Sequence, residues 1–585
     1  MIGEFRSLFP LVRRYRWAYV LGVLSLVVTS GSQLLIPWFI GRAVDTLTIG
    51  SVDLTRIGGM MILMVGTAVV IAAGRLGWRY FIHGASRRIE NDLRIALYDH
   101  LLTLPRSYYE RTKTGDLMAR GTNDLNAVRM AVGMALVAFI DGLFMTVAIL
   151  VILFGRNPRL ALFTILPLPV ITITLIVLGS YIGTLFRSVQ AGFSRLSEQA
   201  QEVFSGIRVV QVFGKEQYFL RRFGEANENY QRQNMRLVRI WGLFFPLVTF
   251  LSGITLLLLL WFGGRSLIAG EITPGDFVAT LSYLQMLIWP MLGAGMTVNM
   301  LHRGAASMGR INEVLDTPSD ITSPANGRTR AAGGTISVRN LSFTYPGAST
   351  PSLSDISFDL AAGQTLGILG RTGSGKSTIL DLLPRLLDPP EGTIFVDGTD
   401  VTRYDLDTLR SAFGLVPQSS FLFSATVADN IRFADPDADD ETVRRYGTIA
   451  AMDTDVADFP DGWDTVVGER GVTLSGGQRQ RIAIARALLK NPPVLMFDDA
   501  LSAVDTHTEE RILASITAER RQQTTIIVSN RVSTLQHADL VLVLEGGTIV
   551  QRGTHATLSA EPGFYQEVYH LQQQEEQDLP EAAER

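Results

Sequence analysis

The sequence predicts an all-α domain of six membrane-spanning helices followed by an α/β domain with a parallel sheet. Two observations carry this prediction. Six apolar runs in the first half of the chain are each long enough to cross a bilayer, which takes roughly 20 helical residues. After residue 334, short β-branched runs alternate with amphipathic helical patterns, as is typical of α/β domains. The composition agrees, because 47% hydrophobic and 18% charged residues make the chain too apolar for an ordinary soluble protein.

The composition also excludes several kinds of chemistry. The chain has no cysteine, which excludes disulfides, thiolate metal sites and thiol catalysis. Its net charge of −4 is small for 585 residues, so we expect no nucleic-acid partner. Basic residues precede the first apolar run, but no small-residue cleavage site follows it. We therefore interpret this run as a permanent span and not as a signal peptide.

The arginines predict how the spans are oriented. The six spans are expected at residues 17–40, 57–81, 134–154, 160–185, 243–262 and 277–300. Arginine is concentrated in segments 84–130 and 187–239, while the other connections are short and carry fewer positive charges. Because positive charge stays in the cytosol, these long segments and both termini are expected there. The sequence thus predicts a multi-pass protein of the inner (cytoplasmic) membrane whose α/β domain is cytosolic.

The long arginine-rich segments have helical periodicity and few breakers, so we expect the spans to continue as helices beyond the membrane. Each segment contains a turn signal, Thr114-Gly115-Asp116 in the first and Ser205-Gly206 in the second. Such a turn would form the tip of a helical pair, and a tip can press on another domain.

Breaks in periodicity mark the domain boundary. Thr317-Pro318, Ser323-Pro324 and Gly333-Gly334 interrupt the helical pattern. We expect a membrane domain at 1–320, a linker at 321–334, the α/β domain at 335–571 and a polar tail at 572–585. The tail is polar enough to be mobile or a short helix, and the sequence assigns it no role.

A phosphate-binding loop lies near the start of the α/β domain. The eight residues from 370 to 377 match G-x-x-x-x-G-K-[ST], namely Gly370, Arg371, Thr372, Gly373, Ser374, Gly375, Lys376 and Ser377, and Thr378 follows them. An apolar run at 365–369 precedes them and a helical run at 379–387 follows, which is the strand–loop–helix context that the motif requires. A chance glycine-rich turn would lack this context. We expect backbone N–H groups to hold phosphates, with Lys376 reaching the β/γ-phosphates and Ser377 binding Mg²⁺. ATP and Mg²⁺ are the expected ligands.

Two further segments complete a motif set. The apolar run that starts at Pro493 ends on Asp498, and the carboxyl end of a buried strand is where an open α/β sheet places its ligand groups. Leu474, Ser475, Gly476, Gly477 and Gln478 precede a helical stretch at 479–489. Taken alone, this Ser-Gly-Gly turn could be only a helix cap.

Together with the phosphate loop and Asp498, that turn identifies a family. The sequence resembles the ATP-binding cassette (ABC) exporters, specifically half-transporters in which a membrane domain precedes a P-loop NTPase cassette. The resemblance implies that Tyr345 stacks on adenine, that Gln418 senses the γ-phosphate and joins Ser377 and Asp498 around Mg²⁺, and that Asp505 lies in a loop crossing the dimer interface. The segment from Leu474 to Gln478 would bind ATP held by the other subunit. The turns near Gly115 and Gly206 resemble the two coupling-helix tips.

Two positions depart from the family pattern. The residue after Asp498 is normally a glutamate that polarises the attacking water, but here it is Asp499, one methylene shorter. A misplaced general base can cost roughly 10²-fold in rate. The family places histidine after Ser529, but here the residue is Asn530, which cannot carry a positive charge. The pattern resembles the degenerate-site subunit of heterodimeric multidrug exporters, whose partner carries the glutamate and the histidine.

Other functions remain open at this point. The chain could form a homodimeric lipid flippase or multidrug exporter with slow ATP hydrolysis. It could also be a non-transporting member of the family, such as an ATP-gated channel or a regulatory subunit. The intact segment from Leu474 to Gln478, which is the signature motif of the family, and Gln418 argue against this.

Four polar or aromatic residues in the predicted spans are candidates for the substrate cavity. They are Asp141, Gln285, Trp289 and Asn299. A charge such as that of Asp141 is costly inside a bilayer, so it should face a cavity or a partner group. Hydrogen bonding between helices explains each single residue at least as well. By resemblance, the substrates are amphipathic drugs, lipids or peptides, and membrane lipid surrounds the spans.

Overall fold

The computed structural model describes residues 3–48, 54–330, 333–468, 474–519 and 523–582. The chain forms two compact units, one of residues 1–102 and 112–317 and the other of residues 103–111 and 318–585. Residues 331–332 of the expected linker and 583–585 of the expected tail lie outside the described residues.

The first unit is all helical, as predicted. Within the residues that the structure describes, six helical stretches are long and apolar enough to cross a membrane, namely Arg16–Thr48, Thr55–Thr103, Thr114–Arg156, Thr172–Ser205, Glu216–Ile268 and Pro274–Leu315. The prediction of six spans is thereby confirmed. The elements are η1 (Glu4–Leu8), α1 (Phe9–Arg14), α2 (Arg16–Thr48), α3 (Leu54–Trp78), η2 (Arg79–His83), α4 (Gly84–Thr103), α6 (Thr114–Ala119), η3 (Arg120–Asp124), α7 (Leu125–Met130), η4 (Ala131–Ala135), α8 (Leu136–Arg156), α9 (Pro158–Ile165), α10 (Pro167–Ser205), α11 (Ile207–Val212), α12 (Glu216–Leu258), η5 (Leu259–Gly263), α13 (Gly264–Ile268), α14 (Pro274–Met286) and α15 (Ile288–Leu315).

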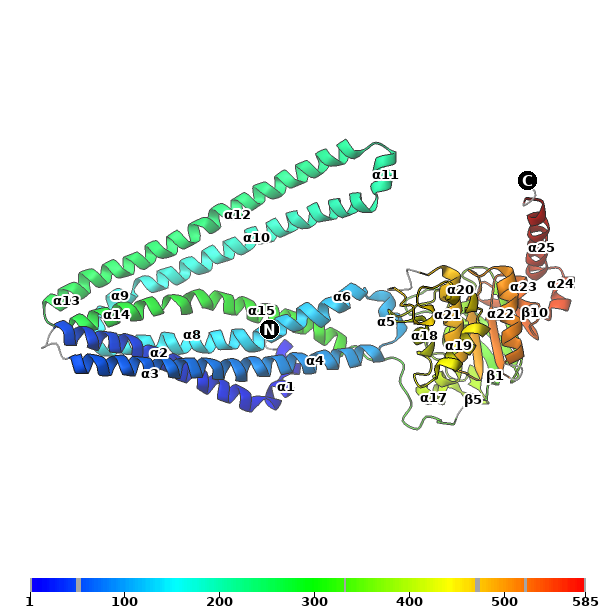
Figure 1. Cartoon of the computed structure of the whole chain (residues 1–585), viewed down its shortest axis with the longest axis horizontal. Coiled ribbons are helices and arrows are strands. Elements are labelled where there is room, and N and C mark those ends of the chain that lie inside the picture. Colours follow the sequence, from blue (N-terminus) through cyan, green and yellow to red (C-terminus); the bar gives the residue numbers. More distant parts are fainter. Residues whose placement is uncertain (1–2, 49–53, 331–332, 469–473, 520–522, 583–585) are drawn as a thin grey trace. The chain divides into compact units, whose positions relative to one another are not determined.

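One of the two predicted tips is correct and the other is displaced. Helices α10 and α12 run side by side and the short α11 joins them directly after Gly206, as expected (Figure 1). In the first segment the chain turns earlier, at Leu104-Pro105, and forms the short helix α5 (Arg106–Arg111). Proline disfavours the helical conformation of the residue before it, so α4 ends there. Thr114-Gly115-Asp116, where we expected the turn, instead opens α6.

An ion pair with a buried carboxylate joins two helices of the first unit, in the arginine-rich segment that precedes the predicted span at 134–154. Asp124 is 6% exposed and accepts hydrogen bonds from Ser307 Oγ (2.8 Å) and Arg310 Nε (2.9 Å) of α15. Burial by itself would raise the pKa of Asp124, but the hydrogen bonds from Arg310 and Ser307 outweigh it and hold the pKa below its usual range. The ionised carboxylate therefore stabilises the fold.

Replacing Asp124 by asparagine is expected to lower the free energy of unfolding by about 1–2 kcal/mol, since hydrogen bonds lose strength when one partner loses its charge. Because the folded-state pKa is depressed, this stabilisation is present above the unfolded-state pKa and is lost as the pH falls through the folded-state value. The measurement is the thermal midpoint of the wild type and the variant in detergent at pH 7.5 and at about pH 2.5, below the ordinary pKa of an aspartate, where the difference should shrink. Asp116→Asn, which removes an exposed i,i+4 partner of Arg120, is the control and should change little. A difference that does not depend on pH would contradict the assignment.

The second unit contains two sheets. One has four antiparallel strands in the order β2-β1-β4-β5, and the other has six strands in the order β10-β9-β3-β8-β7-β6, parallel apart from β10. The strands are β1 (Ile336–Phe343), β2 (Leu353–Leu360), β3 (Thr365–Gly370), β4 (Ile394–Val396), β5 (Thr399–Asp400), β6 (Phe413–Val416), β7 (Val494–Asp498), β8 (Thr524–Val528), β9 (Leu540–Glu545) and β10 (Thr548–Gly553). The helices are α16 (Lys376–Leu382), η6 (Val401–Arg403), α17 (Leu406–Ser411), α18 (Val427–Arg432), α19 (Asp440–Ile449), α20 (Asp453–Ala457), η7 (Gly462–Asp464), α21 (Gly476–Leu489), α22 (Thr506–Glu519), α23 (Val532–Leu535), α24 (His555–Ala560) and α25 (Phe564–Ala582).

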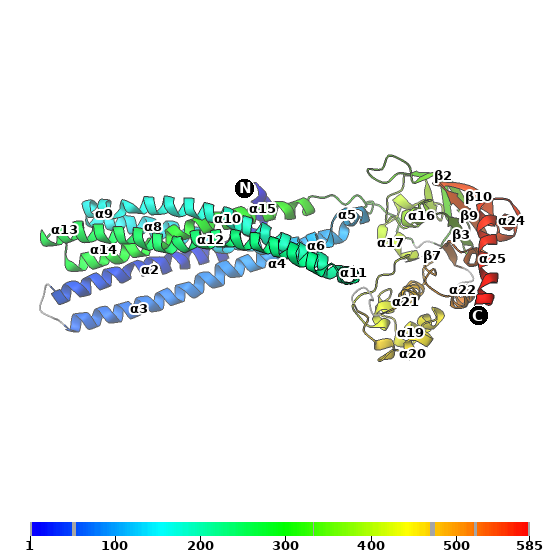
Figure 2. The ribbon, with the colours of Figure 1, turned by 90° about the horizontal axis from the view of Figure 1, so that it is seen from above.

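The order of the larger sheet brings the predicted motifs together. Strands β3, β7, β9 and β10 of this sheet are labelled in Figure 2. The phosphate loop follows β3, Asp498 ends β7, and Asn530 lies just beyond β8, which runs between these two strands. Gln418 lies just beyond β6, next to β7. Because these four strands are parallel, their carboxyl ends share one edge of the sheet, and a site forms there.

Candidate functional site

A cavity of about 340 Å³ lies at this edge of the sheet. Most of the predicted nucleotide-binding residues line it, and the full lining is Tyr345, Ser352, residues 372–378, Gln418, Asp498, Asp499, Val528 and Asn530. Of these, Ser352 and Val528 were missed by the sequence reasoning, because no motif covers them. The signature residues 474–478 and Asp505 are not part of this lining.

The phosphate loop has the backbone that its glycines predict. Gly373 (φ +82°) and Gly375 (φ +97°) adopt left-handed conformations that side chains rarely tolerate. A Cβ at Gly375 would also lie 2.8 Å from the carbonyl oxygen of Ser352. Lys376 begins α16, and its Nζ donates to the carbonyls of Gly370 (2.5 Å) and Arg371 (3.0 Å). Burial lowers the pKa of Lys376, and the charges of Asp499 and Asp498 oppose this effect.

Hard oxygen donors suitable for Mg²⁺ meet beside the loop. Ser377 Oγ donates to Asp498 Oδ1 at 3.0 Å. Burial raises the pKa of Asp498, while this hydrogen bond and the charge of Lys376 act in the opposite direction. Mg²⁺ is commonly bound by one or two such groups together with nucleotide phosphates and waters. The side chains therefore fit a magnesium–nucleotide complex.

The two departures from the family pattern face each other across the cavity. Asp499 Oδ2 lies 3.5 Å from Asn530 Nδ2 and 3.4 Å from Gln418 Nε2, both long for hydrogen bonds. Asp499 adopts a left-handed backbone conformation (φ +48°), which aspartate tolerates better than most residues. Its own N–H donates to the carbonyl of Val528 at 2.9 Å, so the carboxylate is held beside β8. Burial raises the pKa of Asp499.

Tyr345 lines the cavity and contacts the helix that follows the phosphate loop. Its hydroxyl is 3.1 Å from Thr378 Oγ1, and its ring meets Phe343 edge-on with centroids 5.2 Å apart. This leaves an aromatic ring beside the phosphate loop. The adenine-stacking role that the resemblance implies stays a prediction.

The signature turn caps α21. Ser475 Oγ accepts from the N–H of Gln478 (3.2 Å), and Gln478 Oε1 accepts from the N–H of Ser475 (2.9 Å), which is a reciprocal capping box. A Cβ on Gly477 would lie only 2.9 Å from the carbonyl oxygen of Ala503. The signature therefore packs directly against the loop that carries Asp505, whose carboxylate accepts from the N–H of Thr508 at 2.9 Å.

A buried glutamine joins the signature helix to two other loops. Gln480, on the second turn of α21, is 5% exposed. Its Nε2 donates to the carbonyl of Gln418 (3.4 Å), and its Oε1 accepts from the N–H of Ala503 (3.2 Å). The sequence reasoning missed this residue, because the motif that it follows ends at Gln478.

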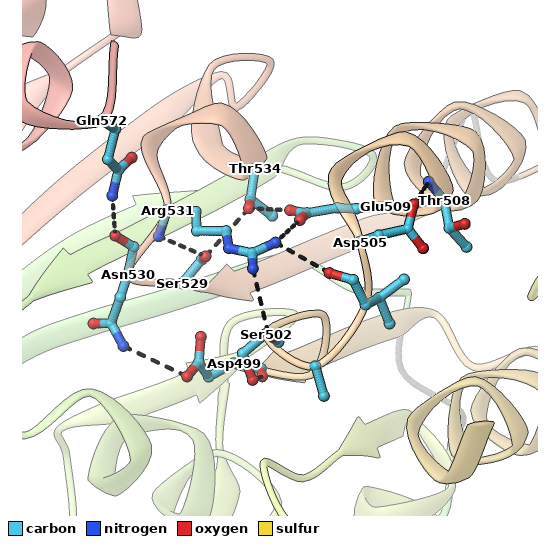
Figure 3. A network of polar contacts seen from close by, with 12 residues as sticks. Asp499, Ser502, Asp505, Thr508, Glu509, Ser529, Asn530, Arg531, Thr534 and Gln572 are labelled. Atoms are coloured by element: carbon cyan, nitrogen blue, oxygen red, sulfur yellow. Dashed lines mark hydrogen bonds and ion pairs between the residues drawn. The ribbon is translucent and has the colours of Figure 1, made fainter. Parts of the chain in front are cut away.

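A polar network behind the cavity also escaped prediction (Figure 3). Glu509 of α22 is 2% exposed, and Arg531 Nη1 donates to its Oε2 at 2.7 Å. The same guanidinium donates to the carbonyls of Val504 (3.2 Å) and Ser502 (3.3 Å). Arg531 therefore ties the segment after β8 to the loop of Asp505. Only the position of Arg531, directly after Asn530, could have drawn attention to it.

Helix α5 is part of the second unit and contacts the phosphate-loop helix. Arg106 Nη1 pairs at 2.7 Å with Asp381 Oδ2, and Asp381 is 7% exposed on α16. Burial raises the pKa of Asp381, and the charge of Arg106 acts against this. Arg111 Nη2 also donates to the carbonyl of Pro346 at 3.0 Å. The short helix α5 thus bonds to the phosphate-loop helix α16 and to the residue that follows Tyr345.

Comparison with known proteins identifies the family. The family described as ABC transporter transmembrane region matches residues 19–291, and the one described as ABC transporter matches residues 353–502. A relative named "probable multidrug resistance ABC transporter ATP-binding/permease protein YheI", from Bacillus subtilis (strain 168), is 39% identical over 98% of this chain and 98% of its own. The chain belongs to the ABC transporter family. It is an exporter of the type in which the membrane and ATP-binding domains are fused.

Other ABC relatives agree with this assignment. The multidrug resistance-like ATP-binding protein MdlA of Escherichia coli (strain K12) is 37% identical over 96% of this chain and 95% of its own length. The ATP-dependent lipid A-core flippase of Photobacterium profundum is 30% identical over 98% of both chains. The solved structure of a bacterial Atm1-family ABC exporter with ATP bound superposes with a TM-score of 0.77 at 27% identity, covering 96% of this chain and 99% of that one.

The four substrate-cavity candidates of this ABC exporter do not form one cluster within the chain. Asp141 on α8 accepts a hydrogen bond from Ser30 on α2, which is 2% exposed, so it contacts a neighbouring helix. Gln285 lines a separate cavity of about 470 Å³ between α12 and α14, together with Thr249, Ser252 and Thr255. Trp289 and Asn299 are exposed on α15. A further cavity of about 460 Å³ is lined by apolar residues that include Phe139 and Ile140, and Asp141 is not part of that lining.

Proposed function

We propose that this chain is one subunit of a heterodimeric ABC exporter that moves amphipathic drugs, lipids or peptides across the inner membrane. Its own site, formed by Lys376, Ser377, Asp498, Asp499 and Asn530, holds Mg²⁺-ATP and hydrolyses it poorly. Its signature, Leu474 to Gln478, completes the hydrolysing site of a partner that carries glutamate and histidine at the corresponding positions. Both termini and the cassette are cytosolic in this proposal, because six spans put them on the same side of the membrane as the arginine-rich segments 84–130 and 187–239.

One observation carries the proposal. Asp499 and Asn530 lie 3.5 Å apart on the same cavity, so both departures fall on the place where a terminal phosphate and its attacking water would sit. The other parts of the motif set keep their expected residues. Independent drift would spread substitutions over the phosphate loop, the signature and Asp498 as well. A change confined to the hydrolysing groups is what a subunit that retains ATP would need.

The names of the relatives support the substrate class. The proteins from Bacillus subtilis and Escherichia coli are named for multidrug resistance, and that from Photobacterium profundum is named as a lipid A-core flippase. Drugs and lipids are both amphipathic. Asp141, Gln285, Trp289 and Asn299 remain our candidates for contacts with such substrates, with a second subunit completing the cavity.

The alternatives differ in how the two ATP sites contribute to turnover. In a heterodimer, hydrolysis depends on the signature of this chain and not on its Asp499. In a homodimeric flippase or multidrug exporter with slow ATP hydrolysis, every active site needs both groups. An ATP-gated channel or regulatory subunit would bind ATP without turnover stimulated by substrate.

The experiment measures ATP hydrolysis by the purified chain alone and after co-expression with its genomic neighbour. We expect activity only in the second case. In the active complex, Gly477→Asp should lower hydrolysis roughly 10²-fold, because it would place a negatively charged carboxylate next to the phosphates of the partner's ATP. Asp499→Asn should change hydrolysis by less than about twofold, because the partner supplies the competent base.

Equal losses from Gly477→Asp and Asp499→Asn would show a symmetric enzyme and would refute the division of labour. Brisk hydrolysis by the chain alone would have the same meaning. ATP binding without hydrolysis in either preparation would favour the channel or regulatory alternative.

A further inference from the structure

The C-terminal helix α25 crosses the boundary that the sequence placed between the ATP-binding domain and a polar tail. Tyr565 is fully buried, and Val568 and Tyr569 pack against the same core as α21 and α22. Gln572 follows them with the spacing of one helical face, so it also points inward. The residue at which we began the tail is therefore part of the folded domain.

Gln572 forms two hydrogen bonds with the backbone around Asn530, and Figure 3 shows the one to Asn530 itself. Its Oε1 accepts from the N–H of Val532 at 2.8 Å, and its Nε2 donates to the carbonyl of Asn530 at 2.9 Å. One amide thus holds both sides of Arg531, whose own side chain points away to Glu509.

The first of these bonds explains how α23 begins. Val532 is the first residue of α23, and the N–H groups in the first turn of a helix need partners from outside the helix. The residue before it, Arg531, has an extended backbone (φ −98°, ψ 127°) and a side chain engaged elsewhere. Gln572 therefore caps α23 from a different helix, in the role that a serine or aspartate usually has.

The second bond has a different consequence, because it acts on Asn530 itself. The side chain of Asn530 lines the ATP cavity, 3.5 Å from Asp499. Holding the carbonyl of Asn530 fixes where that side chain begins. A separate contact joins α25 to the phosphate loop, where the guanidinium of Arg371 lies 5.2 Å from the ring centroid of Phe564. Helix α25 thus contacts two of the segments that form the cavity.

We propose that Gln572 is a positioning residue of the ATP site: it sets the distance of Asn530 from the terminal phosphate of bound ATP and makes α25 part of the nucleotide-binding machinery. Asn530 lies at the phosphate end of the cavity with Asp499, so this role concerns ATP and not ADP. The inference rests on ATP occupying the cavity of this chain and is independent of the subunit composition.

The experiment uses the full-length chain in detergent, with any subunit that co-purifies with it. Labelling of this chain by radioactive 8-azido-ATP on ice is competed with Mg²⁺-ATP or with Mg²⁺-ADP, and gel separation restricts the signal to this chain. Gln572→Met should weaken competition by ATP about 5- to 10-fold, the equivalent of one lost hydrogen bond, and competition by ADP by less than about twofold. Gln574→Met, the same change on the exposed side of α25, is the control and should leave both unchanged.

A second variant separates positioning from simple stabilisation. In Gln572→Glu, one carboxylate oxygen still accepts from Val532 and caps α23, but the other faces the carbonyl of Asn530 and repels it. Gln572→Glu keeps one of the two hydrogen bonds whereas Gln572→Met loses both, so the thermal midpoint should fall no further than in Gln572→Met while the affinity for ATP falls at least as much. The proposal is overturned if ATP and ADP lose affinity equally, if Gln572→Glu keeps the wild-type preference for ATP, or if Gln572→Met behaves like Gln574→Met. Loss of all labelling in the wild type would instead refute the ATP site itself.

Discussion

Replacing Asp499 by glutamate, together with Asn530→His, is expected to raise ATP hydrolysis at this chain's own site by roughly 10²-fold, the size of effect that correct placement of a catalytic group has. The cavity already contains the other groups, since Ser377 contacts Asp498 and Gln418 reaches towards Asp499. Glutamate extends the carboxylate by one methylene towards the position of the attacking water, and histidine adds a group that can carry charge. The left-handed backbone at position 499 adds a stability cost of up to about 1 kcal/mol for glutamate.

Measuring this gain requires that the other site be silent. The substitutions are therefore made in the Gly477→Asp background, where the signature can no longer serve the partner's ATP, and release of inorganic phosphate is measured. Asp437→Glu, an exposed position with the same change of side chain, is the control and should leave the rate unaltered. An unchanged rate in the Asp499→Glu/Asn530→His protein would contradict the view that these two side chains limit hydrolysis at this site.

The second large effect is on stability. Arg531→Met is expected to lower the free energy of unfolding by about 3–5 kcal/mol, because it leaves a buried carboxylate without its charged partner. Glu509 is 2% exposed, and its remaining partner would be Thr534. For a domain of this size we expect a fall of roughly 10 °C in the thermal midpoint of the cassette.

Two variants show whether the stranded charge is the cause. Arg531→Met combined with Glu509→Leu removes both members of the pair and should recover at least half of the loss. Arg511 lies on the same helix as Glu509 and forms a solvent-exposed ion pair with Asp453. Arg511→Met breaks this pair and should lower the free energy of unfolding by about 1 kcal/mol or less. Equal shifts for Arg531→Met and Arg511→Met would contradict the buried-charge explanation. The stabilities of Arg531→Met, of the double variant and of Arg511→Met are measured by thermal unfolding of the full chain, followed by tryptophan fluorescence and circular dichroism.

Features encoded in short segments were predictable from the sequence. The six spans follow from apolar runs, and the phosphate loop and Asp498 follow from strand and turn patterns a few residues long. The tip at Leu104-Pro105 was missed because a glycine at position 115 seemed the stronger turn signal, although proline has the stronger effect on the preceding residue. Gly115 simply starts the next helix.

Contacts between distant segments were not predictable. Glu509 and Arg531 are 22 residues apart, and Gln572 lies 42 residues from Asn530. Nothing in the sequence around Gln572 distinguishes it from Gln573 and Gln574, since only the packing of Tyr565 and Tyr569 decides which glutamine faces inward. Such partners are set by tertiary packing, which a single sequence does not reveal.

The amide of Gln480 places a limit on how this protein can evolve. It binds the backbone at Gln418, which belongs to the chain's own ATP site, and the backbone at Ala503, against which the signature packs. Mutations that reshape either loop would therefore disturb the other loop through this amide. The ends of side chains such as Asp499 and Asn530 can change without moving either loop. In the heterodimer that we propose, one site can thus lose hydrolysis through changes at the ends of these side chains, while the surrounding loops keep their shape.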